Sequence, residues 1–146
     1  MALSSAARAA APEVVERLFA SPLKGQSTAL SLVTLPVSLY WVLGESSAWQ
    51  GTWGKRRVGL RVVRADGARL SLRRAIGRAA AKFVPWEPAH ACIWQVSAAP
   101  QEPSPLITAG LVLVWPRVGA NVASPLASRT RQTLHDRPAG TLVITR

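Results

Sequence analysis

Two long apolar segments dominate the pattern of hydrophobic and polar positions along the chain. Residues 27–44 carry no charged side chain, and residues 106–126 carry one, Arg117. Each segment is close to the ~20 residues that a helix needs to cross the hydrocarbon core of a bilayer. Membrane helices tolerate the prolines and Ser/Thr residues within them when neighbouring groups satisfy the backbone. The pattern therefore predicts two membrane-spanning helices, with a buried helix of a soluble protein as the alternative for the first.

A basic amphipathic helix is predicted between these two segments. Apolar residues recur there at helical spacing, and Ser71 before them is a suitable N-cap. The apolar face comprises Leu72, Ala75, Ile76, Ala79, Ala80 and Phe83, and the other face comprises Arg73, Arg74, Arg78 and Lys82. Such a helix can lie on anionic lipid, or it can present a solvated face on a soluble protein. Pro85 is expected to end it, because proline disrupts helix interiors.

Two further segments have the pattern of β-structure. Residues 60–70 are expected to form a β-hairpin, because Asp66-Gly67 suits a two-residue turn whose central positions need positive φ. Residues 141–145 are apolar and β-branched and read as a short strand. If both segments lie on the same side of a membrane, this strand can pair with the hairpin.

The remaining segments are shorter and less regular. Residues 86–99 are apolar but too short for a comfortable span, so they are expected to be tilted or re-entrant. Residues 1–24 are Ala-rich, and a helical pattern from Pro12 to Phe19 fits a short interfacial helix or a frayed terminus. We therefore expect an N-terminal segment, residues 1–24, followed by a single membrane domain, residues 25–146.

Together these elements predict a mainly α-helical membrane protein. It would contain two to three short transmembrane or re-entrant helices, a basic amphipathic helix, and a small cytoplasmic β-hairpin with a C-terminal strand. Ten Lys or Arg residues and one acid, Asp66, lie between Lys55 and Lys82, directly after the uncharged run. Because Lys and Arg are enriched in cytoplasmic loops, this block and the arginines after residue 127 are expected in the cytoplasm, with an even number of crossings between them.

Composition supports two interpretations of the same charge. The 146 residues have a net charge of +11 and are 49% hydrophobic. A basic soluble protein would suggest nucleic acid, whereas an apolar chain with clustered charge favours a membrane. The expected partners are the bilayer and anionic headgroups. The alternative is a membrane-anchored adaptor or a basic binding protein whose 55–82 face engages anionic lipid, nucleic acid or an acidic partner. The lipid-facing basic patch would comprise Lys55, Arg56, Arg57, Arg73, Arg74, Arg78 and Lys82.

Ionisable residues in or beside the spans are the candidate functional residues, because a charge at the bilayer centre costs roughly 2.5–3.5 kcal/mol on insertion scales. These residues are Glu45, Glu87, His90, Arg117 and Asp136. Arg117 is expected to pair with Glu87 or Glu45 across a helix interface and to line a polar path for ions or small solutes. Alternatively, its side chain extends to the membrane interface.

Neither an enzymatic activity nor a bound cofactor is expected, because the sequence lacks nucleophile-elbow, phosphate-loop, metalloprotease and dinucleotide-binding motifs. Glu87 and His90 share a helix face as metal ligands can, but they supply only two ligands, so no metal site is expected. His135-Asp136 is expected to cap a turn and to anchor the terminal strand near Lys55 or Arg56.

A set of short motifs occurs in one order over roughly residues 40–145. The motifs are Glu45 through Trp49, Thr52-Trp53-Gly54-Lys55-Arg56, Val58 through Val63, Asp66-Gly67, Arg74 through Arg78, Pro85-Trp86-Glu87 with His90, and Arg131 through Asp136 with Ala139-Gly140-Thr141. Each motif is weak alone, but the ordered set is fairly specific. In this set the chain resembles the RDD family of small bacterial membrane proteins.

The resemblance implies a multi-pass protein of the bacterial inner membrane with a cytoplasmic C-terminus. The family is named for one arginine and two aspartates, and Asp136 resembles the second aspartate. Arg8 or Arg17 would stand for the arginine, whereas residues 1–44 contain no aspartate. The resemblance also implies transport of ions or small solutes. Since so few spans cannot enclose a pore, self-association is expected if the protein transports.

Overall fold

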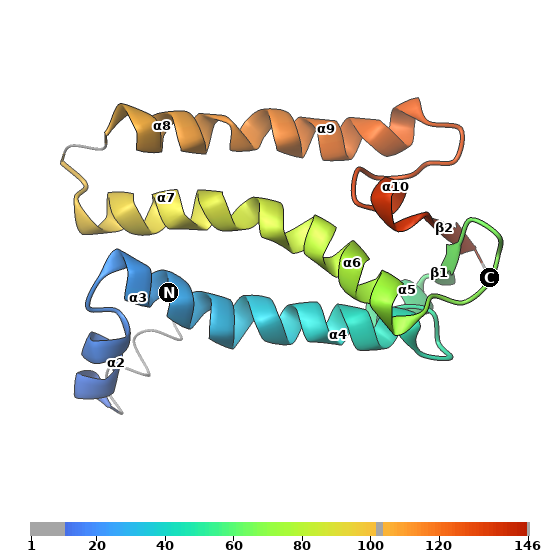
Figure 1. The fold of residues 1–146 in the computed structure, drawn as a ribbon, viewed down its shortest axis with the longest axis horizontal. Helices are drawn as coiled ribbons and strands as arrows, with labels where there is room; N and C mark the ends of the chain where they lie inside the picture. Colours follow the sequence, from blue (N-terminus) through green and yellow to red (C-terminus); the bar gives the residue numbers. More distant parts are fainter. Residues whose placement is uncertain (1–10, 102–103, 146) are drawn as a thin grey trace.

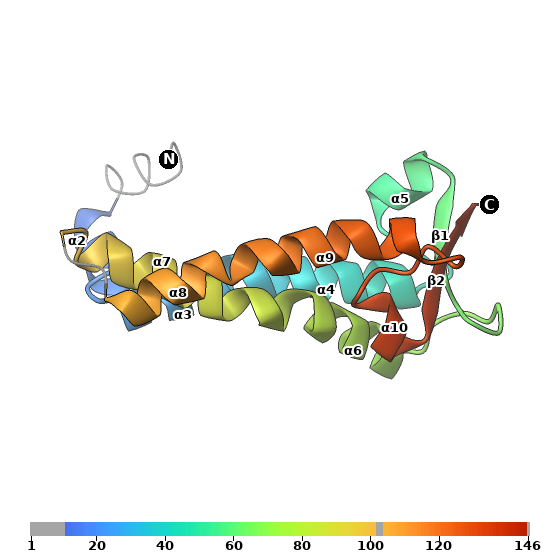
Figure 2. The same cartoon turned by 90° about the horizontal axis from the view of Figure 1, so that it is seen from above.

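Three long helical segments lie side by side, with a small sheet at one end of them (Figures 1 and 2). The computed structural model describes residues 11–101 and 104–145. The three segments are α3 (Pro22–Ala29), η1 (Leu30–Thr34) and α4 (Leu35–Ser46); α6 (Leu72–Phe83), η2 (Val84–Trp86) and α7 (Glu87–Ala98); and α8 (Pro105–Val112) and α9 (Val114–Ala127). The shorter elements are α2 (Pro12–Leu18), α5 (Trp53–Arg57), β1 (Leu60–Arg64), α10 (Asp136–Ala139) and β2 (Thr141–Thr145).

The first and third segments have the length and apolar character of membrane spans, as predicted. Pro22–Ser46 has 25 residues and Pro105–Ala127 has 23. In their most apolar windows, 6% and 0% of the residues are buried. The core helix of a soluble protein would instead be mostly buried, because water drives apolar side chains inward. The exposure of these helices therefore favours lipid as their surroundings.

The first segment contains a π-helical turn, Leu30–Thr34, just before Pro36. Proline lacks a backbone N–H, and its ring crowds the carbonyl group four residues earlier. A π turn widens the helix locally, which accounts for a continuous helix through this proline. At the far end of the segment, Gly25 packs against the ring of Trp94 on α7 so closely that a Cβ on Gly25 would lie 2.6 Å from it.

The second segment confirms one prediction and overturns another. Ser71 caps α6 by accepting a hydrogen bond from the Arg74 amide at 3.4 Å, as expected. Pro85 does not end the helix, because residues 84–86 form a single 3₁₀ turn that leads directly into α7. Residues 86–99 are therefore not an isolated short span. They form the distal part of a bent helical segment that runs from Leu72 to Ala98 (Figure 1).

The sheet has two antiparallel strands, β1 and β2. Leu60 pairs with Thr145 and Arg64 pairs with Thr141, so the predicted pairing of the C-terminal strand is confirmed. The predicted 60–70 hairpin forms only in part. Across the turn at Asp66-Gly67 the Arg64 amide donates to the Ala68 carbonyl at 2.9 Å and an isolated antiparallel bridge links Val63 to Arg69, without a second strand. The chain has no length left for a second hairpin strand, because the side chain of Leu70 enters the core and α6 begins two residues later.

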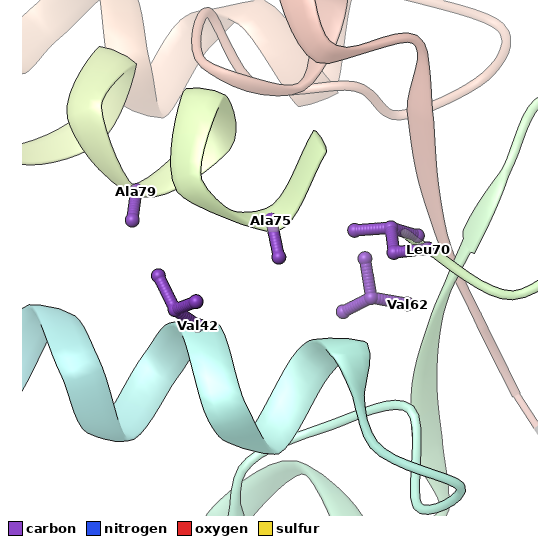
Figure 3. Packing of buried hydrophobic residues seen from close by; sticks show 5 residues of the cluster. All are labelled: Val42, Val62, Leu70, Ala75 and Ala79. Carbon is purple, nitrogen blue, oxygen red and sulfur yellow. The ribbon is translucent and has the colours of Figure 1, made fainter. Parts of the chain in front are cut away.

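A small apolar core lies where α4, α6 and the sheet meet (Figure 3). It consists of Val42, Val62, Leu70, Ala75 and Ala79. Ala75 and Ala79 point from α6 toward α4, and their small side chains let the two helices approach closely. This core fixes one end of the helical segments, and the most extensive polar cluster in the described residues lies directly beside it.

Candidate functional site

Arg78 lies at the centre of a buried ionic network that joins α4, α6 and α10. Its Nη1 donates hydrogen bonds to both carboxylate oxygens of Glu45 at 2.7 Å. Its Nη2 donates to Oδ1 of Asp136 at 2.6 Å. All three residues are at most 2% exposed. A single guanidinium therefore holds together two carboxylates that lie 33 residues before it and 58 residues after it in the chain.

The network includes a second cation and balances its charge. Lys55 donates from Nζ to Oε1 of Glu45 at 2.6 Å. The Nε of Arg78 donates to Oδ1 of Asp136 at 2.8 Å and to Oγ1 of Thr141 at 3.2 Å. Two buried carboxylates thus face two cations. Such a cluster is tolerated in a low-dielectric environment because its charges are paired and hydrogen-bonded.

Asp136 also organises the chain around itself. Its Oδ2 accepts hydrogen bonds from the backbone amide of Thr133 at 3.0 Å and from the Thr133 hydroxyl at 2.6 Å. The Thr141 hydroxyl donates to Oδ1 at 3.0 Å. Asp136 thereby closes the turn that begins at Thr133 and holds the start of β2. The cation that bonds to Asp136 is Arg78, whereas the sequence suggested Lys55 or Arg56. Lys55 lies close enough to interact electrostatically with Asp136, but its hydrogen bond is to Glu45.

The environment of the network shifts three pKa values. Burial raises the pKa of Asp136, but the positive charge of Arg78 and the hydrogen bonds from Thr133 outweigh it, so the net shift is downward. Burial, together with repulsion by Arg78, lowers the pKa of Lys55 and outweighs the opposing effect of Glu45. Burial and repulsion by Arg78 lower the pKa of His135 to about 4. At neutral pH, Asp136 is therefore ionised and His135 is neutral.

The indole of Trp41, on α4, contacts Lys55 of the network and a second lysine, Lys82. The Nζ of Lys82 lies 2.9 Å from the centroid of this ring, and the Nζ of Lys55 lies 4.6 Å from it. A cation over an aromatic face is stabilised by the ring quadrupole, most strongly where water is excluded. Trp41 therefore helps to place two lysines next to the paired carboxylates.

A second polar group lies midway along the helices. Oε1 of Glu87 accepts a hydrogen bond from the Thr34 hydroxyl at 3.3 Å, and Nδ1 of His90 lies 3.5 Å from the same oxygen. Thr34 is the central residue of the 25-residue helical segment Pro22–Ser46. Glu87, His90 and Lys82 line a cavity of about 270 Å³ whose other walls are mainly apolar. Glu87 thus presents a carboxylate at mid-depth of the helical layer.

The expected ion pairs of Arg117 do not form. Glu45 is engaged by Arg78 and Lys55, and Glu87 by Thr34 and His90. Within residues 11–101 and 104–145, Arg117 makes no ion pair, and its buried Nε has no hydrogen-bond partner. The pairing of Arg117 with Glu87 or Glu45 is therefore wrong for a single copy of the chain.

The predicted basic patch is divided between exposed and buried positions. Arg73 and Arg74 are exposed on α6. Arg56 and Arg57 stack on Trp49 and Trp53, at 4.3 and 5.3 Å from the ring centroids. Arg78 is not part of a lipid-facing patch, because it points toward α4 and α10 and is 2% exposed.

Lys55 and Lys82, two further members of that patch, are also partly buried. The sequence analysis missed the role of Arg78, although the sequence contains one indication of it. Arg78 directly precedes Ala79, which with Ala75 belongs to the apolar face of α6, so Arg78 lies at the border of the face that is buried.

Comparison with known proteins identifies one family. A family model described as the RDD family matches residues 14–140, which is most of the chain. The match therefore extends further toward the N-terminus than the motifs alone indicated, and it includes Arg17 but not Arg8. Among curated proteins and among solved structures, no match to this chain was found.

Proposed function

We propose a function from the premise that this chain belongs to the RDD family, a family of membrane proteins. In this proposal the three helical segments cross the inner membrane of a bacterium, and α5, the sheet and α10 lie in the cytoplasm. The charge distribution supports this orientation, because Lys and Arg favour the cytoplasmic side. Exposed arginines at this end of the structure are Arg57, Arg69, Arg73, Arg74, Arg129, Arg131 and Arg137.

Within this topology the proposed activity is the transfer of protons or small cations. The observation that carries it is the position of Glu87, whose carboxylate bonds to the central residue of the first helical segment. An ionisable group at mid-depth of a bilayer is costly to insert and marks ion pathways in membrane proteins. A purely structural hydrogen bond at this depth would not require a titratable side chain.

The groups around Glu87 suit uptake and release of a cation. Its carboxylate binds a proton or a small cation and returns to the ionised form on release. The Thr34 hydroxyl orients the carboxylate, and the His90 imidazole is close enough to exchange a proton with it. The adjoining cavity of about 270 Å³ gives the cation space beside these groups. The π turn that ends at Thr34 is a feature often found at functional sites.

A complete pathway requires more than one copy of the chain. Three helical segments do not enclose a pore, and within the described part of the chain no helix covers the outer side of the exposed apolar faces of α8 and α9 (Figure 2). In the proposal, copies associate so that the cavities beside Glu87 are shielded from lipid.

The proposal is tested by flux measurements on the reconstituted protein. The full chain is incorporated into liposomes, and the decay of a proton, sodium or potassium gradient is followed with an ion-sensitive dye. Glu87→Gln preserves the size of the side chain and removes its charge, so flux should fall to the level of empty liposomes. Glu16→Gln is the matched control, because Glu16 is exposed on α2. If the wild-type chain moves none of these ions, or if Glu87→Gln moves them equally well, the proposal is wrong.

The second candidate function is that of a membrane-anchored adaptor whose basic cytoplasmic surface engages an acidic partner. The exposed Arg73, which forms no ion pair in the described residues, favours it. An adaptor would retain its partner after Glu87→Gln, whereas a transporter would lose its flux. A peripheral basic protein, including one that binds nucleic acid, would leave the membrane in alkaline carbonate, whereas a transporter or a membrane-anchored adaptor would remain.

A further inference from the structure

We propose that α4 and α6 form a binding site for one anionic phospholipid. One acyl chain would occupy the apolar groove between these helices, and the phosphate would bind at Arg73. The site depends on the proposed membrane location. Its groove reaches Glu87 at one end, but binding of the lipid does not require ion transfer.

The groove has the size and lining of an acyl-chain site. It measures about 490 Å³, within the range of roughly 300–1,000 Å³ typical of ligand pockets. Its walls are almost entirely apolar and include Leu35, Leu39 and Leu43 from α4 and Leu72, Ile76 and Phe83 from α6. The leucine and isoleucine side chains among these six are between 51% and 56% exposed. The groove is therefore open along its length.

A polar hollow lies beside the cytoplasmic end of this groove. Ser71, Arg73, Arg74 and Gly77 line it from α6 and its N-cap, and Pro138 and Ala139 line it from α10. The Nη1 of Arg74 donates to the carbonyl oxygen of Ala139 at 3.2 Å, which holds this guanidinium at the edge of the hollow. Arg73 is exposed and has no carboxylate partner among the described residues. Its guanidinium is free to bind a phosphate in a fork-like geometry.

The groove and the polar hollow are adjacent, so that one amphiphilic molecule can occupy both. Leu72 lines the groove and Arg73 lines the polar hollow. Consecutive residues of an α-helix point about 100° apart, so these side chains occupy adjacent faces of the same turn. A molecule that lies along α6 with its charged end at the first turn contacts both. Because α6 contains arginines and a lysine but no acid, the charged end is an anion.

A lipid fits this site better than a protein segment does. The groove continues from Leu72 to Leu35 and on toward Glu87, into the depth of the helical layer. An extended peptide there would bring backbone N–H and C=O groups into an apolar environment without partners, which is strongly unfavourable. A hydrocarbon chain has no such groups, and a phosphate at Arg73 remains at the level of the cytoplasmic headgroups.

Native mass spectrometry of the full chain tests the proposal. The protein is reconstituted into phosphatidylcholine bilayers that contain a minor fraction of phosphatidylglycerol, and the lipids retained after gentle release are counted. The wild-type chain should retain one phosphatidylglycerol in preference to phosphatidylcholine. Arg73→Gln should weaken this retention about fivefold, the factor equivalent to ~1 kcal/mol for one basic residue at the surface. Arg129→Gln is the matched control, since it removes the same charge from an exposed position outside both hollows.

A second variant tests the groove without changing the charge. Ala80 lines the groove at an exposed position, so Ala80→Phe should fill part of it and reduce retention of phosphatidylglycerol. Equal retention of both lipids by the wild-type chain would overturn the site, and so would equal retention by Arg73→Gln and Arg129→Gln. Loss of flux with preserved lipid retention in Glu87→Gln would leave the lipid site intact. Extraction of the wild-type chain by alkaline carbonate would refute the membrane location on which both proposals depend.

Discussion

The Nη1 of Arg78 donates hydrogen bonds to both carboxylate oxygens of Glu45, at 2.7 Å to each, although the two residues are 33 positions apart in the chain. The opposite edge of the same guanidinium holds Asp136. The end of α4, the middle of α6 and the start of α10 therefore meet at a single side chain. Neither helix–helix packing nor the small apolar core makes this three-way connection.

Removing the cation from this network should be strongly destabilising. Arg78→Met leaves Asp136 without its cation and Glu45 with Lys55 alone, and breaking a buried ion pair by removing one partner costs about 3–5 kcal/mol. We expect a large fall in the thermal unfolding temperature of the protein in detergent. Arg73→Met, at an exposed position on the same helix, should change this temperature little.

A neutral form of the network separates charge from shape. The triple variant Glu45→Gln, Arg78→Met and Asp136→Asn removes the carboxylates that Arg78→Met leaves unpaired. It should therefore be more stable than Arg78→Met alone, because unpaired buried charge is the main cost. If the triple variant is the less stable of the two, the loss comes from packing and hydrogen bonds, and the electrostatic account is incorrect.

The stability of the end that holds the sheet and α10 should depend on pH through His135. The pKa of His135 is about 4 in the folded chain, against an ordinary value of 6.5. Between these values the unfolded chain binds a proton that the folded chain does not, so stability should decrease as pH falls from about 6.5 to about 4. Asp136 contributes little in this window, because its folded pKa lies below 3.8 and its effect is lost only under more acidic conditions.

Hydrogen exchange of the β2 amides provides the measurement. After correction for intrinsic exchange rates, protection of Thr141–Thr145 should fall between pH 6.5 and pH 4 in the wild-type chain. His135→Gln retains a polar side chain without a titration in this range, so its protection should be nearly independent of pH. A variant that loses protection in parallel with the wild-type chain would assign the effect to another group.

Because Gly25 contacts Trp94 closely, a larger side chain at position 25 should destabilise the packing of α3 against α7. A Cβ on Gly25 would lie 2.6 Å from the indole ring, so Gly25→Ala forces α3 and α7 apart. Overpacking of this kind costs about 1–3 kcal/mol. Among the residues that the structure describes, none has an atom within 4 Å of a Cβ on Gly119 of α9, and alanine there should be neutral or stabilising by up to about 1 kcal/mol. Unfolding temperatures of the two variants in one detergent make the comparison, and equal shifts would contradict it.

The sequence analysis correctly predicted the elements that are determined by neighbouring residues in the chain. The two apolar spans follow from segment length and hydropathy, and the start of α6 follows from the capping hydroxyl of Ser71. The pairing of β2 with β1 also followed, since both were placed on one side of a membrane. Pro85 was misjudged because a single 3₁₀ turn absorbs a proline that would disrupt a regular α-helix.

The ionic network could not be predicted because its partners are distant in the chain. Glu45 and Asp136 were each identified as candidates, but nothing local shows that both face Arg78. Helical periodicity placed Arg78 among the exposed basic residues. Its position borders the apolar face, and the fold turns it inward toward two carboxylates.

The pairing of β1 with β2 imposes an order on assembly. β1 and Arg78 emerge from the ribosome before α8 and α9, whereas Asp136 and β2 emerge after them. Until then β1 has an unpaired edge and Arg78 lacks one of its two counterions, so a nascent chain stalled after α9 carries an open strand and an excess buried positive charge. Translation of Asp136–Thr145 supplies both missing partners, the second carboxylate and the strand that pairs with β1.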